Sequence, residues 1–363
     1  MPHQSTVDIN KDWVMLGRNY QRQHFSTQNI EPPLEIAWKE GVNSVVTDHP
    51  LAMGKYIFAP TKSGRLYLID YNSGQGIGSG DIGPSLEHVP AIHQNIMYAG
   101  TSIGNETLIG FDLSRSKRVL SAKYPYINTS PLIWNDKIYF GTVDNLFICA
   151  YLETGNEIWR YETNGPIRSS PAFHKGTVVF GDDKGWLYAM DATSGAELWK
   201  KELNGTIYSH PVLGDSLVYV GTVSGTMYSL SLNTGKIKWD QSFSGSIYGS
   251  PALYKNILYF GNNAHEVIAL HKDSGELIWK FKTKGIVNTA PLPSPDYLYV
   301  TSWDKHLYVL NRFSGKLVFE YLLDKPSKSS PIIYKEYLLV HAANNDLIAF
   351  ANEQFIQARR KQK

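Results

Sequence analysis

The chain has 363 residues, of which 42% are hydrophobic, 13% aromatic and 19% charged, and its formal net charge is +2. This composition can fill a large core, and it lacks the chain-wide basic excess that would indicate nucleic-acid binding. The single cysteine excludes an intramolecular disulfide, and no apolar run is long enough to predict a transmembrane helix.

Residues 1–33 precede the repeats described below, and we expect them to form an N-terminal extension that packs on the rest of the chain. They contain no basic segment followed by an apolar run and no lipid-accepting cysteine. As written, the chain therefore carries no export signal, which favours the cytoplasm. Removal of a leader before the first residue would change that assignment.

From residue 34 onward the chain is periodic. A proline before a short apolar run recurs at intervals of 40 or 41 residues, at Pro50, Pro90, Pro131, Pro171, Pro211, Pro251, Pro291 and Pro331. In the clearest unit we expect strands at 167–173, 177–180, 186–190 and 197–200, separated by turns rich in Gly, Asp and Ser. Four-stranded units of about 40 residues are typical of propeller blades. The sequence therefore predicts an all-β fold, an eight-bladed β-propeller of residues 34–352 with four antiparallel strands per blade.

A tryptophan marks the fourth strand of most units. We expect a structural ring of indoles that fill the wedges between neighbouring blades, formed by Trp38, Trp159, Trp199, Trp239 and Trp279. Gly78 and Leu120 stand at this position in the first two units, so those blades should be looser on the outside.

The last unit stops after residues 347–350 and lacks its tryptophan strand. Residues 34–39 (LEIAWK) resemble the fourth strand at 275–280 (GELIWK), and Trp38 precedes Pro50 by the 12 residues found in the other units. We therefore expect the N-terminal strand to complete the last blade and close the ring, because an open ring would expose two sheet edges. Residues 353–363 should form a basic C-terminal tail, solvated and frayed.

The pattern SSPA, VVFG and GWLYAMDATSGAELW, within residues 169–199, resembles the PQQ-like propeller repeat. Quinoprotein dehydrogenases and the propeller lipoprotein of the outer-membrane β-barrel assembly machinery share that repeat, and such relatives are commonly periplasmic or membrane-associated. The resemblance covers residues 34–352 and implies the fold. Residues 12–26 also resemble the segment before the first strand in quinoprotein dehydrogenases.

In the dehydrogenases, the resemblance implies a quinone held between a tryptophan and a vicinal disulfide, with Ca²⁺ on carboxylate and amide oxygens. A chain with one cysteine cannot form a vicinal disulfide, and the regular spacing leaves no room for those enzymes' long insertions. We therefore predict no PQQ, no Ca²⁺ and no catalytic residues. The sequence contains no HExxH, no Cys/His cluster and no Gly-x-Ser-x-Gly motif, so we predict no metal site either.

Candidate binding residues come from the position three before each repeat proline and from the loops after the second strands. We expect both to lie at one end of the ring, which we call the funnel face. The candidates are Glu87, Asn128, Arg168, Tyr208, Tyr248, Asn288, Trp303 and Lys328. Because equivalent positions on a ring converge on the axis, we expect Arg168, Tyr208, Tyr248 and Lys328 to form one positive, aromatic patch suited to an acidic partner. The alternative is a water-filled channel lined by polar groups.

These observations predict a non-catalytic scaffold, a monomeric propeller by itself, that binds a protein partner through the funnel face or serves as a subunit of a larger assembly. The alternative is a small-molecule binder or an enzyme, for a sugar or a quinone, with its site on the propeller axis.

Overall fold

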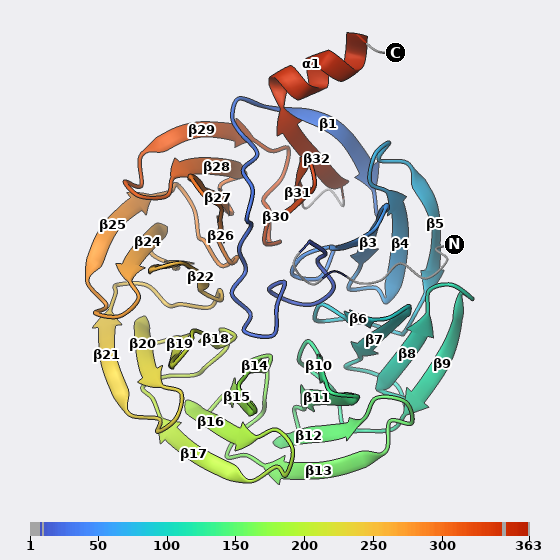
Figure 1. The fold of residues 1–363 in the computed structure, drawn as a ribbon, viewed down its shortest axis with the longest axis vertical. Helices are drawn as coiled ribbons and strands as arrows, with labels where there is room; N and C mark the ends of the chain where they lie inside the picture. The colour runs from blue at the N-terminus through green and yellow to red at the C-terminus, as the bar shows by residue number, and fades with distance from the viewer. Residues whose placement is uncertain (1–7, 9–10, 343–345, 362–363) are drawn as a thin grey trace.

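The computed structural model describes residue 8, residues 11–342 and residues 346–361, and it has the predicted eight-bladed β-propeller fold. The described residues form eight four-stranded sheets arranged as a ring around a central axis (Figure 1). Each sheet is antiparallel and follows chain order from the axis outward, except that the last blade takes its outer strand from the N-terminal side.

The strands form four concentric sets. The innermost are β2 (Leu51–Met53), β6 (Ala91–His93), β10 (Leu132–Trp134), β14 (Ala172–His174), β18 (Val212–Leu213), β22 (Ala252–Tyr254), β26 (Leu292–Pro293) and β30 (Ile332–Tyr334). The second are β3 (Tyr56–Pro60), β7 (Ile96–Gly100), β11 (Lys137–Gly141), β15 (Thr177–Gly181), β19 (Leu217–Gly221), β23 (Ile257–Gly261), β27 (Tyr297–Thr301) and β31 (Tyr337–Ala342). The third are β4 (Arg65–Asp70), β8 (Leu108–Asp112), β12 (Leu146–Tyr151), β16 (Trp186–Asp191), β20 (Thr226–Ser231), β24 (Glu266–His271), β28 (His306–Asn311) and β32 (Asp346–Asn352). The outermost are β5 (Gly76–Asp81), β9 (Lys117–Ala122), β13 (Glu157–Glu162), β17 (Glu197–Glu202), β21 (Ile237–Ser242), β25 (Leu277–Lys282), β29 (Leu317–Leu322) and β1 (Leu34–Gly41).

The inner strands are shorter than the sequence predicted. In the unit at 167–199 the first strand was expected at 167–173, but β14 begins at Ala172. The preceding proline has no N–H to donate to a neighbouring strand. The residue before it bonds a different blade, since Ser170 N donates to His210 Nδ1 at 2.8 Å. These residues therefore join blades instead of extending a sheet.

The ring closes as predicted, through pairing of the two chain ends. Strand β1 pairs antiparallel with β32, from Leu34 opposite Asn352 to Gly41 opposite Asp346. The pairing gives the last blade its fourth, outermost strand, so this blade has the same four-stranded sheet as the others. Residues more than 300 positions apart in sequence thus hold the propeller closed.

A bulge in each outer strand turns the tryptophan position inward. In the fourth blade Trp199 lies opposite Ala189 and Glu197 lies opposite Met190, so Leu198 is the extra residue and is exposed. The same register shift occurs in all eight blades. Such a bulge re-aims side chains and increases the local twist.

Each inward-turned indole packs on a turn of the next blade. Trp199 Nε1 donates to Leu232 O at 2.7 Å. Equivalent bonds join Trp38 to Tyr71 O (3.2 Å), Trp239 to Lys272 O (2.9 Å) and Trp279 to Arg312 O (3.0 Å). Trp159 also packs on such a turn, although its Nε1 has no hydrogen-bond partner. The turn glycine is Gly195, which has a φ of +73°, and a Cβ added to it would lie 2.5 Å from the indole. Glycine is therefore required at this turn both by the backbone angle and by the ring against it.

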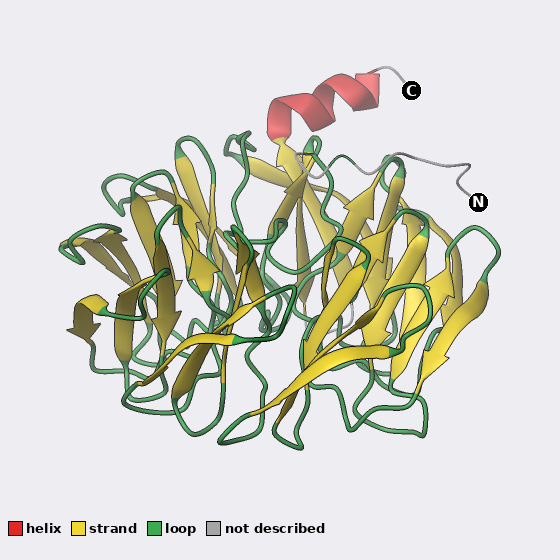
Figure 2. Cartoon of the chain, turned by 60° about the horizontal axis from the view of Figure 1, so that its bottom comes forward, coloured by secondary structure: helices red, strands yellow, loops and turns green. Residues whose placement is uncertain are grey.

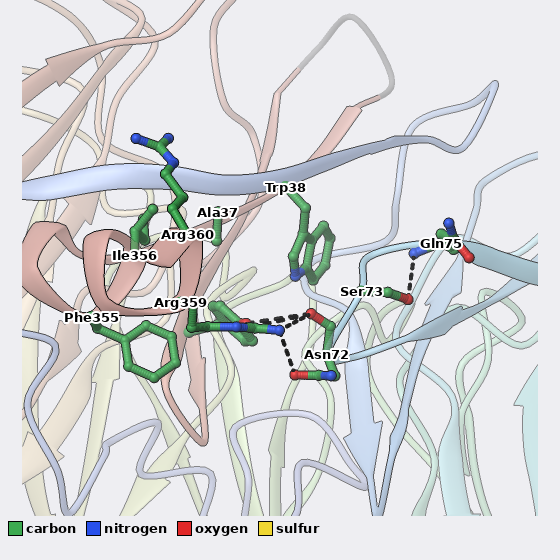
Figure 3. Close-up of a pocket in the computed structure, with 10 residues that line it drawn as sticks. Ala37, Trp38, Asn72, Ser73, Gln75, Phe355, Ile356, Arg359 and Arg360 are labelled. Carbon is green, nitrogen blue, oxygen red and sulfur yellow. Dashed lines mark hydrogen bonds between the residues drawn. The ribbon is translucent and has the colours of Figure 1, made fainter. Parts of the chain in front are cut away.

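The C-terminal residues contradict the expectation of a frayed tail. Glu353–Lys361 form helix α1, at the edge of the ring beside β1 and β32 (Figure 2). Ile356 is buried against the last blade, and Arg359 Nη2 donates to Asn72 Oδ1 at 2.9 Å in the first blade (Figure 3). A groove of about 490 Å³ lies beside these contacts. Among the described residues, no helix is long and apolar enough to cross a membrane.

Candidate functional site

One end of the propeller axis is covered by the N-terminal segment, residues 11–30, which crosses the centre of the ring (Figure 1). This segment hydrogen-bonds to all eight blades. The bonds join Trp13 and Ala52 (2.9 and 2.8 Å), Val14 and Ile92 (2.7 Å), Arg22 and Pro131 (3.2 Å), Tyr20 and Phe173 (2.8 Å), Gln21 and Leu213 (3.0 Å), Gln23 and Leu253 (2.9 Å), Ser26 and Pro293 (2.8 Å), and His24 and Pro331 (3.1 Å). We call residues 11–30 the axial segment.

Arg22 is the most unusual residue of the axial segment, because its guanidinium is buried without a carboxylate among its hydrogen-bond partners. Its three nitrogens donate to the carbonyl oxygens of Pro171 (2.9 Å), Leu16 (2.7 Å) and Pro131 (3.2 Å). Burial lowers the pKa of Arg22 from 12.5 to about 9. The side chain remains charged at neutral pH and ties the segment to two neighbouring blades.

Histidine rings fill much of the axis. His24 and His49 lie 5.6 Å apart between ring centroids, and both pack edge-on against Trp13. His49 Nε2 accepts from Gly17 N at 3.2 Å while its Nδ1 lies 2.9 Å from Pro50 O, an arrangement that fits the neutral ring. Burial lowers the pKa of both histidines below 6.5. Packed side chains therefore occupy the axis beneath the axial segment.

In four blades, the residue directly before the repeat proline links one blade to the next. The backbone N–H of one residue donates to the side chain 40 positions later: Ser130 to Ser170 Oγ (2.8 Å), Ser170 to His210 Nδ1 (2.8 Å), His210 to Ser250 Oγ (2.9 Å) and Ala290 to Ser330 Oγ (2.9 Å). These bonds explain why hydroxyl and imidazole side chains are frequent at this position.

The candidate binding residues lie at the other end of the inner strands, at the funnel face. The axial segment bonds the repeat prolines and residues up to two positions after them, whereas the candidates lie three before, about 10 Å from the proline along an extended chain. Loops after the second strands lie beside them, since Asp183 N donates to Pro166 O and Trp303 N to Ile286 O. Along the chain, both predicted sets therefore lie on the side of the repeat prolines away from the contacts of the axial segment.

Three of the candidates form a continuous cluster. Arg168 forms an ion pair with Asp183 and lies with its guanidinium carbon 6.0 Å from the centroid of the Tyr208 ring. Tyr208 stacks on Tyr248, with 5.7 Å between centroids and 13° between planes. Tyr248 is 37% exposed, so the ladder ends on a ring open to solvent. A cation, two stacked phenols and a carboxylate therefore meet at three adjacent blades.

The fourth residue of the expected patch, Lys328, lies elsewhere. Its Nζ is 4.6 Å from the Trp303 ring centroid, and Trp303 is 38% exposed. Among the described residues, no ion pair or ring contact joins Lys328 to the Arg168 cluster. The funnel face thus carries two separate cation–aromatic groups where the sequence predicted one, because the blades hold equivalent positions apart around the ring.

The remaining candidates have local partners. Glu87 forms an ion pair with Lys62 at 3.2 Å, and this neighbour balances its negative charge. Asn128 Oδ1 accepts from His88 Nε2 at 2.9 Å, and the His88 ring faces His210 at 6.3 Å between centroids. Asn288 Oδ1 is buried without a partner.

Sequence reasoning missed His88 as a residue of this site. His88 lies two residues before Pro90, and no other unit has a histidine at that position, so the repeat did not mark it. Burial lowers the pKa of the His88 and His210 rings, which are neutral at physiological pH. They therefore contribute a ring contact and a hydrogen bond to Asn128 rather than a charge.

The residues present do not fit the quinone and calcium of the dehydrogenases that share the repeat. Cys149 is the single cysteine and is buried in β12, where burial raises its pKa to about 12, so it supplies no vicinal disulfide. Asn263 and Asn288 have amide oxygens without partners, but the described part of the chain holds no group of three or more His, Cys, Asp or Glu side chains able to bind a metal. No step through a quinone can be derived from this donor set.

Comparison with known proteins agrees with the repeat. A family model described as outer membrane protein assembly factor BamB matches residues 148–285 and 263–357, more than half of the chain. The structure of BamB from Moraxella catarrhalis superposes with a TM-score of 0.72 and 18% identity over 88% of this chain and 99% of that one. A europium-containing methanol dehydrogenase superposes with a TM-score of 0.83 and 12% identity over 94% and 98%.

A curated relative, quinohemoprotein alcohol dehydrogenase ADH IIB of Pseudomonas putida, is 24% identical over 195 residues. That match covers 49% of this chain but only 23% of the enzyme. The structural likenesses, at these identities, show the fold alone. The family model covers enough of the chain to decide membership: this protein belongs to the family of PQQ-like propellers that the model describes as outer membrane protein assembly factor BamB.

Proposed function

We propose that the chain is a non-catalytic scaffold that binds a protein partner through its funnel face. The observation that carries the proposal is the ladder of Arg168, Tyr208 and Tyr248, which is ordered by its own contacts and ends at the surface. Arginine and tyrosine are enriched among residues that dominate binding energy at protein interfaces. The family's description as an assembly factor supports a role in a larger complex.

The asymmetry of the ring favours this end for the partner. The other end is covered by the axial segment, which bonds all eight blades and leaves fewer inner-strand groups for a partner. At the funnel face, the aromatic side chains Tyr248 and Trp303 are more than one-third exposed. An acidic segment of a partner would meet Arg168 and Lys328 beside these rings.

The test is a double substitution, Arg168→Ala with Tyr208→Ala, in partner capture from the native cell by cross-linking and quantitative mass spectrometry. We expect capture to fall at least roughly tenfold, about 1.4 kcal/mol, while the melting temperature stays within a few degrees. The matched control is Arg160→Ala with Phe313→Ala, which removes an exposed arginine and an exposed aromatic ring away from the funnel face. Equal capture by wild type and the funnel variant would contradict the proposal.

The second candidate function, a quinone or sugar binder, rests on the dehydrogenase relatives. It predicts a rise in melting temperature with PQQ and Ca²⁺ together, since a ligand that binds only the folded chain stabilises it. The scaffold proposal predicts no shift. Melting curves of the same protein, with and without PQQ and Ca²⁺, therefore distinguish the two proposals.

A further inference from the structure

A groove on the outer rim lies where most blades hold a tryptophan of their own. It has a volume of about 840 Å³ and lies between the second and third blades, lined in part by Tyr98, Leu120, Asp136, Tyr151, Leu152 and Glu153. Volumes of roughly 300–1,000 Å³ are typical of ligand sites. Tyr151 is 53% exposed, so the groove is open to a molecule from outside.

Leu120 occupies the tryptophan register of its blade. It lies opposite Gly110 beside a bulge, just as Trp199 lies opposite Ala189. A Cβ added at Gly155 would lie 3.2 Å from Leu120 Cδ1, so the leucine touches the turn of the next blade as the indoles do. Leucine is smaller than tryptophan and has no N–H, so the outer part of the wedge stays empty.

The equivalent wedges between other blades show which side chain fits in this position. In four of them an indole N–H donates to the carbonyl three residues before the turn glycine, at 2.7–3.2 Å. The corresponding carbonyl here belongs to Leu152, three before Gly155, and it lines the groove. In three blades the indole also packs 6.0–6.1 Å from a tyrosine of the second strand. Tyr98 holds that register here, opposite Ala91 as Tyr259 is opposite Ala252.

The charge around the groove is negative. Asp136 and Glu153 are exposed carboxylates on its two turns, and no lysine or arginine is among the described residues that line it. The carboxylate of Glu153 acts with burial to raise the pKa of Tyr98 to about 12. A positively charged neighbour of an incoming indole would therefore be favoured here.

We propose that this groove, which we call the rim groove, is a docking site for a tryptophan of a partner protein, in a segment with lysine or arginine next to that tryptophan. The indole packs on Tyr98 and Leu120 and donates its N–H to the Leu152 carbonyl, as the chain's own indoles do in the sibling wedges. The cationic neighbours face Asp136 and Glu153. This proposal does not depend on the funnel face.

A foreign tryptophan fits better than one from this chain. Of the nine tryptophans, all lying within the described residues, Trp303 is the most exposed, at 38%. Trp303 lies at the funnel face with Lys328 over its ring. A second copy would have to release that contact to reach the rim groove.

The probe is the peptide acetyl-Lys-(5-fluoro-Trp)-Lys-amide, followed by ¹⁹F NMR as the protein is added. We expect a saturable shift with wild type and at least a tenfold weaker affinity with Leu120→Trp, which fills the wedge with the chain's own indole. That variant should fold, because four sibling blades carry tryptophan in the same register with its N–H bonded. Leu198→Trp is the matched control: it adds an indole on an exposed bulge of another blade, and binding should be unchanged.

The peptides with alanine for tryptophan, and with glutamate for both lysines, should each bind at least tenfold more weakly. Equal binding of the probe to wild type and Leu120→Trp would overturn the proposal, as would no saturable shift with wild type. The remaining candidate occupant is a second copy of this chain, and analytical sedimentation of the protein without peptide tests it by measuring the oligomeric state. A dimer that Leu120→Trp dissociates would make the occupant a second copy and reject the foreign partner.

Discussion

Arg22 provides the sharpest test of how the propeller is held together. Its guanidinium donates to the carbonyls of Leu16, Pro131 and Pro171, all inside the protein. Substitution by methionine keeps the apolar stem and removes all three bonds. Each buried carbonyl left without a donor costs about 1–3 kcal/mol, and relief of burying a charge offsets part of the sum. We expect Arg22→Met to lower the free energy of unfolding by about 3–5 kcal/mol.

Urea unfolding, followed by tryptophan fluorescence, measures this loss. The matched control is Arg160→Met, which removes an exposed arginine paired with Glu157 and should cost no more than about 1 kcal/mol. Arg22→Lys keeps the charge but cannot reach three carbonyls, so its loss should lie between the two. A loss below about 1 kcal/mol for Arg22→Met would refute the role assigned to the guanidinium.

Hydrogen exchange shows whether the segment detaches before the propeller unfolds. The amides of Phe173, Leu213 and Leu253 donate to carbonyls of the axial segment. In Arg22→Met they should exchange faster, while amides inside the second strands keep their protection. Uniform loss of protection across the blades would mean that Arg22 stabilises the ring as a whole, and that the axial segment is not a separate unit.

Two further predictions concern buried rings. Burial lowers the pKa of His341 from 6.5 to about 4, so the unfolded chain takes up the proton first as the pH falls. The contribution of this ring to the free energy of unfolding should be full above pH 6.5 and decline towards pH 4. His341→Leu should remove about 3 kcal/mol of that decline, measured by urea titrations at several pH values. Trp239→Phe should cost about 1 kcal/mol more than Trp159→Phe in the same assay, because the Trp239 N–H is bonded and that of Trp159 is not; equal losses would show that the bond contributes nothing.

The architecture could be predicted because repetition reveals what each position does. The tryptophan at position 199 recurs with similar neighbours every 40 residues, and the 12-residue offset between Trp38 and Pro50 predicts the closing strand from the sequence. The axial segment occurs once, so it offers no internal comparison. Buried Arg22 runs against the usual preference of charged side chains for solvent, and carbonyls of Leu16 and of two blades far along the chain accept from its guanidinium.

The candidate site was predictable as a set of positions but not as a set of contacts. Repetition placed Arg168, Tyr208 and Lys328 at one end of the ring. Which of them meet depends on side-chain length and on the angle between blades, and Lys328 lies over Trp303 instead of near Arg168. Helix α1 was missed because its basic residues outweigh the two apolar ones, of which Ile356 is buried against the last blade.

The two proposed sites use the repeat in opposite ways. At the funnel face, residues at equivalent positions differ from blade to blade. The proposed binding surface is therefore formed by side chains that the repeat does not require for its fold. At the rim groove, one blade lacks a residue that its siblings keep, so the missing indole specifies the occupant. Because the sites share no residue, Arg168→Ala with Tyr208→Ala should leave peptide binding unchanged, and Leu120→Trp should leave capture at the funnel face unchanged. A scaffold with this arrangement could hold two partners at once.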